Sequence, residues 1–214
     1  TTRYKNAVTF NGGIGQAEAS YATTVPTAPF QSMEARGRLL NAASANGISL
    51  VTGDATLAYR GWDKVNDVWK PMLTGALRTA AYFKADGVVV VYDWLTSATP
   101  RKFEWNYHGV SAFTTSGATL VANNGSSKAC IQHYGVPGTV STTTAFAVAP
   151  ENGGANQGHA RLSATTATTK AVMVSVIRAD CKALAVAVSF SGDSARVTVG
   201  TRAVTMNREA VTIE

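Results

Sequence analysis

The hydrophobic and polar positions of residues 82–108 form two different β patterns in succession. Residues 88–91 are four valines followed by Tyr92, a β-branched run typical of a strand buried on both faces. After a polar turn at residues 96–97, aromatic residues at 103, 105 and 107 alternate with Glu104, Asn106 and His108. This period of two predicts one aromatic and one polar face. We expect a hairpin whose second strand turns its polar face towards water, a ligand or a polar seam.

Short strand patterns recur along the rest of the chain, separated by Gly, Asn and Pro. Asn11-Gly12-Gly13 and Asn46-Gly47 predict tight turns. The Trp-rich segment 61–72 predicts one helical turn before Pro71, and the Gly-rich segment 150–158 predicts a linker or a long loop. Further strands are expected at 7–10, 35–44, 48–51, 77–83, 110–114, 118–122, 128–134, 144–148, 171–177, 183–190, 195–199, 202–206 and 210–213.

More than a dozen short strands at this spacing predict an all-β fold, an antiparallel β-sandwich. We expect a single domain over residues 1–214, with a candidate sub-boundary near 150–158.

The composition says more about the class of binding partner than about the fold. Charged residues are only 15% of the chain, and the net charge is +6, from 19 basic and 13 acidic residues. A basic surface favours an anionic partner. The basic residues are scattered and match no nucleic-acid motif, so we expect no nucleic-acid partner. An acidic polysaccharide suits scattered positive charge, although improved solubility alone also explains a charge of this size.

Three further features leave alternatives open. Cys130 and Cys181 form either one cross-link, in an oxidising compartment, or two separate buried thiols. No apolar run reaches the roughly 20 residues of a membrane span, so no membrane partner is expected. The chain opens with Thr1, which we interpret as the edge of a processed chain, a proteolytic product or an expressed fragment. A terminal Thr is also a potential nucleophile.

Common catalytic signatures are absent: the chain contains no GxxxxGK, GxSxG, HExxH or CxxC motif. Among the three histidines, His108 stands out because it shares the predicted polar face with Glu104 and Asn106. An imidazole near a carboxylate can be tuned for proton transfer. A strand-end histidine bonded to the backbone is the competing interpretation.

Three ordered segments carry a resemblance to a known family. They are TRYKNAVTFNGGIGQ, then GDATLAY, then RTAAYFKADGVVVVYDWLTSATPRKFEWNYHG. In this order they resemble the C-terminal β-sandwich part of heparinase II/III-type polysaccharide lyases. In that family a T-R-x-H-N-x-x-x-x-x-G-x-G-Q motif opens the sandwich. The similarity covers residues 1 to about 110 and is weaker beyond.

The resemblance implies a supersandwich-like fold, an α/α-toroid chain or domain as partner, and an acidic polysaccharide such as heparan sulfate or alginate as substrate. Such lyases act by β-elimination: a base removes the proton next to the uronate carboxylate, and an acid protonates the leaving oxygen. The toroid carries the family's catalytic Tyr.

Matching positions imply a set of site residues. The resemblance assigns His108 as catalytic and Arg3, Lys5, Asn6 and Gln16 as substrate-binding. The family's zinc-ligating His is replaced by Lys5, a cation that does not ligate zinc, so the cofactor stays unassigned and no metal site is expected. A hairpin ion pair is expected for Asp93 and Arg101, which also match.

Together these observations predict the β-sandwich portion of a secreted or periplasmic polysaccharide lyase, inactive without its toroid. The main alternative is a non-catalytic carbohydrate-binding or structural module that uses Trp62, Trp69 and Trp94 as stacking surfaces. A hydrolase that uses Thr1 is the other alternative.

Overall fold

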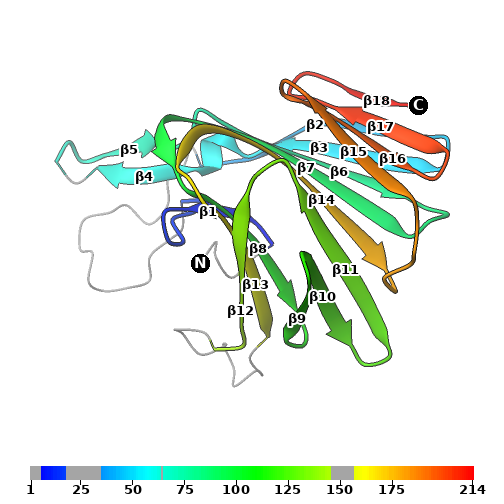
Figure 1. The fold of residues 1–214 in the computed structure, drawn as a ribbon. Coiled ribbons are helices and arrows are strands. Elements are labelled where there is room, and N and C mark those ends of the chain that lie inside the picture. The colour runs from blue at the N-terminus through cyan, green and yellow to red at the C-terminus, as the bar shows by residue number, and fades with distance from the viewer. Residues whose placement is uncertain (1–5, 18–34, 64, 146–156) are drawn as a thin grey trace.

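A large antiparallel sheet forms the middle layer of the molecule (Figure 1). The computed structural model describes residues 6–17, 35–63, 65–145 and 157–214. In spatial order the eight strands of this sheet are β2 (Arg38–Ala45), β3 (Ile48–Asp54), β6 (Gly75–Phe83), β7 (Val88–Arg101), β14 (Thr168–Ala179), β11 (Ser127–Tyr134), β10 (Thr119–Asn124) and β9 (Phe113–Ser116).

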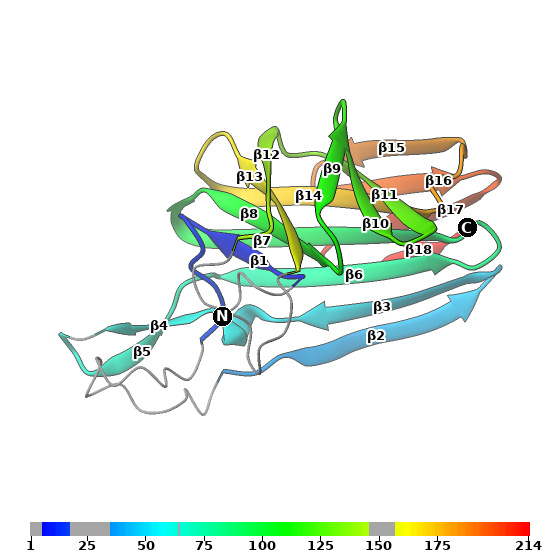
Figure 2. The ribbon, with the colours of Figure 1, turned by 90° about the horizontal axis from the view of Figure 1, so that it is seen from below.

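Two four-stranded antiparallel sheets pack on opposite faces of the central sheet (Figures 1 and 2). One contains, in order, β1 (Val8–Phe10), β8 (Phe103–Gly109), β13 (Gly158–Ala164) and β12 (Gly138–Thr143). The other contains β15 (Val186–Ser191), β16 (Ser194–Val199), β17 (Arg202–Met206) and β18 (Val211–Ile213). A separate hairpin is made by β4 (Arg60–Asp63) and β5 (Val68–Pro71), next to a 3-10 turn at Thr56–Ala58.

Strand alternation divides most of the buried side chains between two large cores, and a smaller third cluster contains Phe113, Leu120, Ile131 and Ala160. On β7, Val88, Val90 and Tyr92 face the C-terminal sheet, where they meet Val197 and Val204 in one core. Leu95 on the other face of β7 belongs to a second core. The remaining fully buried members of that second core include Phe10, Leu73, Phe103, Trp105 and Met173. The predicted all-β antiparallel sandwich is therefore confirmed, as two cores between three layers.

Several local predictions are confirmed. Asn46 and Gly47 form the turn between β2 and β3, with φ of 49° and 74°, the left-handed region that Asn and Gly tolerate best. Asn11-Gly12-Gly13 is also a turn with positive φ, closed by a bridge between Phe10 and Ile14. Strands in the last third lie within a few residues of their expected positions.

The predicted central hairpin is wrong. Residues 96–97 are not a turn, because β7 continues without a break from Val88 to Arg101. A single residue then leads into β8, which pairs with β1 and β13 in a different layer and not with β7. The two patterns of residues 82–108 therefore lie on the two sides of one core. Ser97 is buried, and its hydroxyl donates to the carbonyl of Thr99 at 2.7 Å, so this polar residue is satisfied within a strand.

Other differences concern the loops. Segment 61–72 forms the β4–β5 hairpin and not a helical turn, with Trp62 opposite Trp69. Most of the strand expected at 144–148 lies outside the described residues, and the strand just before it, β12, covers Gly138–Thr143. Most of the segment 150–158 lies outside the described residues, and the strands on either side of it, β12 and β13, pair with each other.

Cys130 and Cys181 form a disulfide bond with their Cα atoms 4.9 Å apart. It joins β11 to the turn after β14, so the first of the two alternatives for these cysteines is correct. No helix among the described residues has the length and apolar character needed to cross a bilayer.

Candidate functional site

A cavity of about 280 Å³ lies between the central sheet and β8. Its walls come from seven strands and from Asn6, which lies just before β1, so distant parts of the sequence meet there. The polar lining residues are Asn6, Arg78, Asn106, Tyr107, His108 and Ser175, and the apolar ones are Val91, Phe113, Ala122, Ala129, Ile131 and Ile177.

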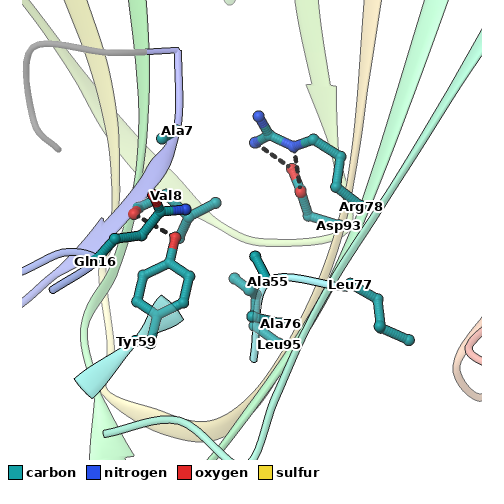
Figure 3. Close-up of a pocket in the computed structure, with 10 residues that line it drawn as sticks. All are labelled: Ala7, Val8, Gln16, Ala55, Tyr59, Ala76, Leu77, Arg78, Asp93 and Leu95. Atoms are coloured by element: carbon teal, nitrogen blue, oxygen red, sulfur yellow. Dashed lines mark hydrogen bonds and ion pairs between the residues drawn. The ribbon is translucent and has the colours of Figure 1, made fainter. Parts of the chain in front are cut away.

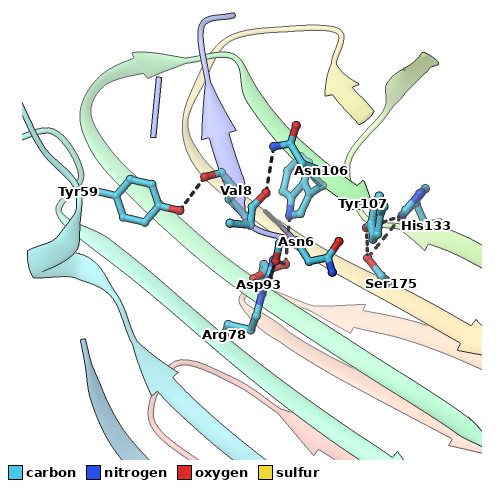
Figure 4. Close-up of polar contacts among 11 residues, drawn as sticks. Asn6, Val8, Tyr59, Arg78, Asp93, Asn106, Tyr107, His133 and Ser175 are labelled. Atoms are coloured by element: carbon cyan, nitrogen blue, oxygen red, sulfur yellow. Dashed lines mark hydrogen bonds and ion pairs between the residues drawn. The ribbon is translucent and has the colours of Figure 1, made fainter. Parts of the chain in front are cut away.

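Arg78, in the cavity wall, forms an ion pair with Asp93 (Figure 4). The guanidinium binds both carboxylate oxygens of Asp93, at 2.7 and 3.0 Å, and donates a third hydrogen bond to the backbone carbonyl of Asn6 at 2.7 Å. The indole of Trp105 donates to the same carboxylate at 3.1 Å. Burial lowers the pKa of Arg78, but the charge and hydrogen bonds of Asp93 outweigh it and raise the pKa above its usual value. Arg78 is therefore a permanent cation that fixes the start of β1. The predicted partner of Asp93, Arg101, instead lies over the ring of Phe10.

Asn6 and His108, two of the residues that the resemblance assigned to the site, are in direct contact, and their roles there stay predictions. The Oδ1 atom of Asn6 accepts a hydrogen bond of 2.7 Å from the backbone N–H of His108. The ring of His108 stacks on that of His159, with centroids 4.6 Å apart and planes 6° from parallel. His159 Nε2 lies 3.1 Å from Asn106 Oδ1. His108 is thus held by its backbone and by ring stacking.

The polar face of β8 is a buried seam, one of the three environments expected for it. Glu104 accepts hydrogen bonds from the hydroxyl of Thr9 at 2.7 Å and from the N–H of Gly12 at 2.8 Å. Asn106 donates to the carbonyl of Ala7 and to the hydroxyl of Thr9, each at 3.0 Å. Glu104 therefore anchors the β1 turn and has no contact with His108 among these bonds.

On the opposite face of β8, Tyr107 points across the cavity to two other strands (Figure 4). Its hydroxyl lies 2.8 Å from Ser175 Oγ on β14 and 3.3 Å from His133 Nδ1 on β11. Burial raises the pKa of Tyr107 and lowers the pKa of His133 to about 4. Both groups are therefore neutral at pH 7, and this cluster can donate and accept hydrogen bonds but does not supply a charged base.

Gln16 lies on the other side of the Arg78–Asp93 pair, in a second cavity of about 90 Å³ (Figure 3). Tyr59 shares this cavity and donates a hydrogen bond of 2.7 Å to the carbonyl of Val8. The structure therefore brings Asn6 and His108 together and separates Gln16 from them. Arg3 and Lys5 lie outside the described residues, so their substrate-binding role stays a prediction.

The site includes residues that the sequence did not single out. Arg78, His133 and Ser175 come from β6, β11 and β14, none of which pairs with β8. Arg78 opens the third family-like segment, but no local motif marks His133 and Ser175, because the packing of one layer on another brings them to Tyr107.

Two other kinds of site can be compared with the structure: a metal site, and a stacking surface formed by the three tryptophans of the alternative prediction. Among the described residues, no group of three or more His, Cys, Asp and Glu side chains is placed to hold a metal ion. Trp62 and Trp69 pack edge to face, with planes 62° apart, and Trp94 is buried with its indole bound to Asp193. These three rings do not form a coplanar exposed surface.

Comparison with known proteins identifies the fold. No family model and no curated protein sequence matches the chain. Among solved structures, a heparinase III matches with a TM-score of 0.57 and 12% identity over 80% of this chain. The heparan sulfate lyase HepC from Pedobacter heparinus matches with a TM-score of 0.59 and 9% identity over the whole chain. This is a heparinase III-like fold. The chain spans only 27% and 30% of the length of those two proteins, so the heparinase III-like fold corresponds to one part of each.

Proposed function

We propose that this chain is the β-sandwich part of a polysaccharide lyase that cleaves an acidic, uronate-containing polysaccharide by β-elimination. The observation that carries the proposal is the contact of Asn6 with His108 at the wall of the cavity, in a fold shared with heparan sulfate lyases. The larger size of those proteins supports a second part, an α/α toroid, that completes the site. Without it, the chain is inactive.

In the proposed reaction the proton on the carbon next to the uronate carboxylate passes to a base. The electron pair of that C–H bond forms a double bond to the neighbouring carbon, and the glycosidic oxygen leaves with a proton from an acid. His108 is the candidate for one of these proton transfers in this chain. Asn6 and His159 position it, the first through the backbone and the second through ring stacking.

A secreted or periplasmic location belongs to the same proposal. The disulfide between Cys130 and Cys181 supports it, because disulfides persist mainly in oxidising compartments.

The first experiment is the intact mass of every polypeptide that co-purifies with this chain from its native source. Fractions that contain the chain are then assayed for unsaturated uronate products on heparan sulfate and on alginate. We expect activity only where a toroid-sized part accompanies the chain, and its loss in His108→Ala. Phe190→Ala, an exposed aromatic substitution on the far sheet, is the matched control. Absence of unsaturated product with both polysaccharides in the complete enzyme would overturn the proposal.

A further inference from the structure

Among the described residues, no other layer covers one part of the central sheet. Figure 2 shows β2, β3 and the outer half of β6 with no strand in front of them, whereas β1, β8 and β13 cover the neighbouring part. On this lower face Tyr82 and Val51 are 44% and 42% exposed. The other face of the same strands is closed, since Ile48 and Phe83 are fully buried against the C-terminal sheet. Tyr82 pairs with Ser49, two residues before Val51, so an exposed aromatic ring adjoins an exposed aliphatic side chain on this face.

The strand register connects this surface to the cavity. Val51 pairs with Ala80, Ala80 with Val91, and Val91 with Ser175. Val91 and Ser175 line the cavity, so this row of side chains runs directly out of it. The next row joins Tyr82 through Val89 to Ile177, which also lines the cavity. From standard strand spacings, the Cα atom of Tyr82 lies roughly 8 Å from that of Val91.

The polar groups of the surface are hydroxyls and one amine. Lys84 Nζ lies 3.4 Å from Ser44 Oγ, which lies 2.9 Å from Ser49 Oγ on the neighbouring strand. Tyr82, Val51 and Arg78 each belong to a row of side chains that are paired across β3, β6 and β7. The one acidic side chain in these three rows is Asp93, and Arg78 neutralises it. A ligand on this face therefore meets a ring, hydroxyls and a cation, with no uncompensated carboxylate. This combination complements a sugar chain that carries acidic groups.

We propose that the Tyr82 face, defined by Ser44, Ser49, Val51, Tyr82, Lys84 and Val89, binds the acidic glycan where it extends beyond the cavity. Tyr82 stacks on the apolar face of one sugar ring, and Lys84 binds its carboxylate or sulfate. This inference rests on the proposed function, because it takes the ligand to be the same polysaccharide. It adds a second, non-catalytic binding region that acts only on chains long enough to reach from the cavity to β6.

The test is calorimetric titration of the 214-residue chain with short and long oligosaccharides of heparan sulfate and of alginate. Tyr82→Ala should raise Kd for the long oligosaccharides on the order of threefold to tenfold and leave the short ones unchanged. Lys84→Gln should raise Kd for the long ones and reduce its salt dependence. Phe190→Ala and Lys128→Gln, an exposed ring and an exposed lysine on other surfaces, are the matched controls.

The outcomes separate this inference from the proposed function. If His108→Ala weakens binding of both lengths while Tyr82→Ala and Lys84→Gln bind like the controls, the Tyr82 face is overturned and the cavity stands. If only the Tyr82 and Lys84 variants lose affinity and the complete enzyme makes no unsaturated product, the face stands and the lyase proposal fails. Equal losses for short and long oligosaccharides, or no binding by the unsubstituted chain, would also overturn the Tyr82 face.

Discussion

Asn6 holds His108 through the backbone: the amide oxygen of Asn6 accepts the N–H of His108 at 2.7 Å, across the end of β1 and β8. The carbonyl of Asn6 is itself fixed by Arg78 on the central sheet. Asn6 thus connects the four-stranded sheet that contains His108 to the central sheet. The position of the His108 backbone relative to the cavity therefore depends in part on this connection.

Removing the side chain of Asn6 should therefore disturb the site more than it disturbs the fold. We expect Asn6→Ala to lower the free energy of unfolding by about 1 kcal/mol, the usual net value of one hydrogen bond. Glycan affinity, or turnover in the complete enzyme, should also fall, and by more than a variant with the same loss of unfolding free energy elsewhere in the chain. Denaturant unfolding and the titrations described above measure the two effects.

A second asparagine provides the control for Asn6. Asn207 also accepts backbone N–H groups, from Glu209 and Ala210 at 2.7 Å each, but it lies in the turn between β17 and β18 of the C-terminal sheet. Asn207→Ala should cost similar stability and leave glycan affinity unchanged. Equal affinity losses in both variants would show that Asn6 acts only through stability.

The Arg78–Asp93 pair should be strongly coupled. Asp93 is 2% exposed, whereas the side chain of Arg78 is 39% exposed, so solvent screens part of the interaction. We expect Arg78→Met to destabilise the chain by about 2–3 kcal/mol, because it leaves a buried carboxylate with only the Trp105 indole as a side-chain donor among the observed bonds. The double variant Arg78→Met/Asp93→Leu should lose less than the sum of the single variants. A double-mutant cycle of unfolding free energies tests this, and strict additivity would contradict the coupling.

How much of the fold could be predicted from the sequence depends on whether each feature is determined by neighbouring residues or by distant ones. The Asn46-Gly47 turn and the alternation of 103–108 are local, and both gave the correct elements. The pairing of 103–108 was not predictable in the same way. A polar Thr-Ser pair suggests a turn, but Ser97 is buried and satisfied inside a 14-residue strand. Whether a chain turns back or crosses to another layer depends on tertiary burial, which a local pattern does not encode.

The same distinction applies to the candidate site. Asn6 and His108 were predicted because each lies in a motif with a family resemblance, and they are in contact. Ser175 and His133 pair with each other across β14 and β11 and meet Tyr107 from another layer. No spacing in the sequence connects these three residues, so they were found only in the structure.

His133 should make the fold sensitive to mild acid. Its pKa falls from 6.5 to about 4 on folding because burial disfavours the charged ring. The folded state therefore binds fewer protons than the unfolded state between these values. The contribution of neutral His133 to the free energy of unfolding is therefore complete above about pH 6.5 and is lost as the pH falls towards 4. Between pH 7 and pH 5 we expect a loss of about 2 kcal/mol from this group.

His133→Gln separates this titration from the other acid-sensitive groups. The variant keeps polar atoms near Tyr107 and Ser175 but has no imidazole to protonate. Unfolding free energies measured at pH 7 and pH 5 should differ less in the variant than in the unsubstituted chain. Identical pH dependence in the two proteins would show that His133 does not titrate as its burial implies.

The disulfide should contribute measurably to stability under oxidising conditions. Cys130 and Cys181 are 51 residues apart, and a cross-link over a loop of this length stabilises by up to about 4 kcal/mol in the chain-entropy account. We expect Cys130→Ala/Cys181→Ala to unfold at lower denaturant concentration than the unsubstituted chain. A reductant should lower the midpoint of the unsubstituted chain towards that of the variant and leave the variant unchanged. If reductant has no effect on the unsubstituted chain, either the bond is absent in solution or the β11–β14 pairing alone limits unfolding, and intact mass after thiol alkylation distinguishes the two.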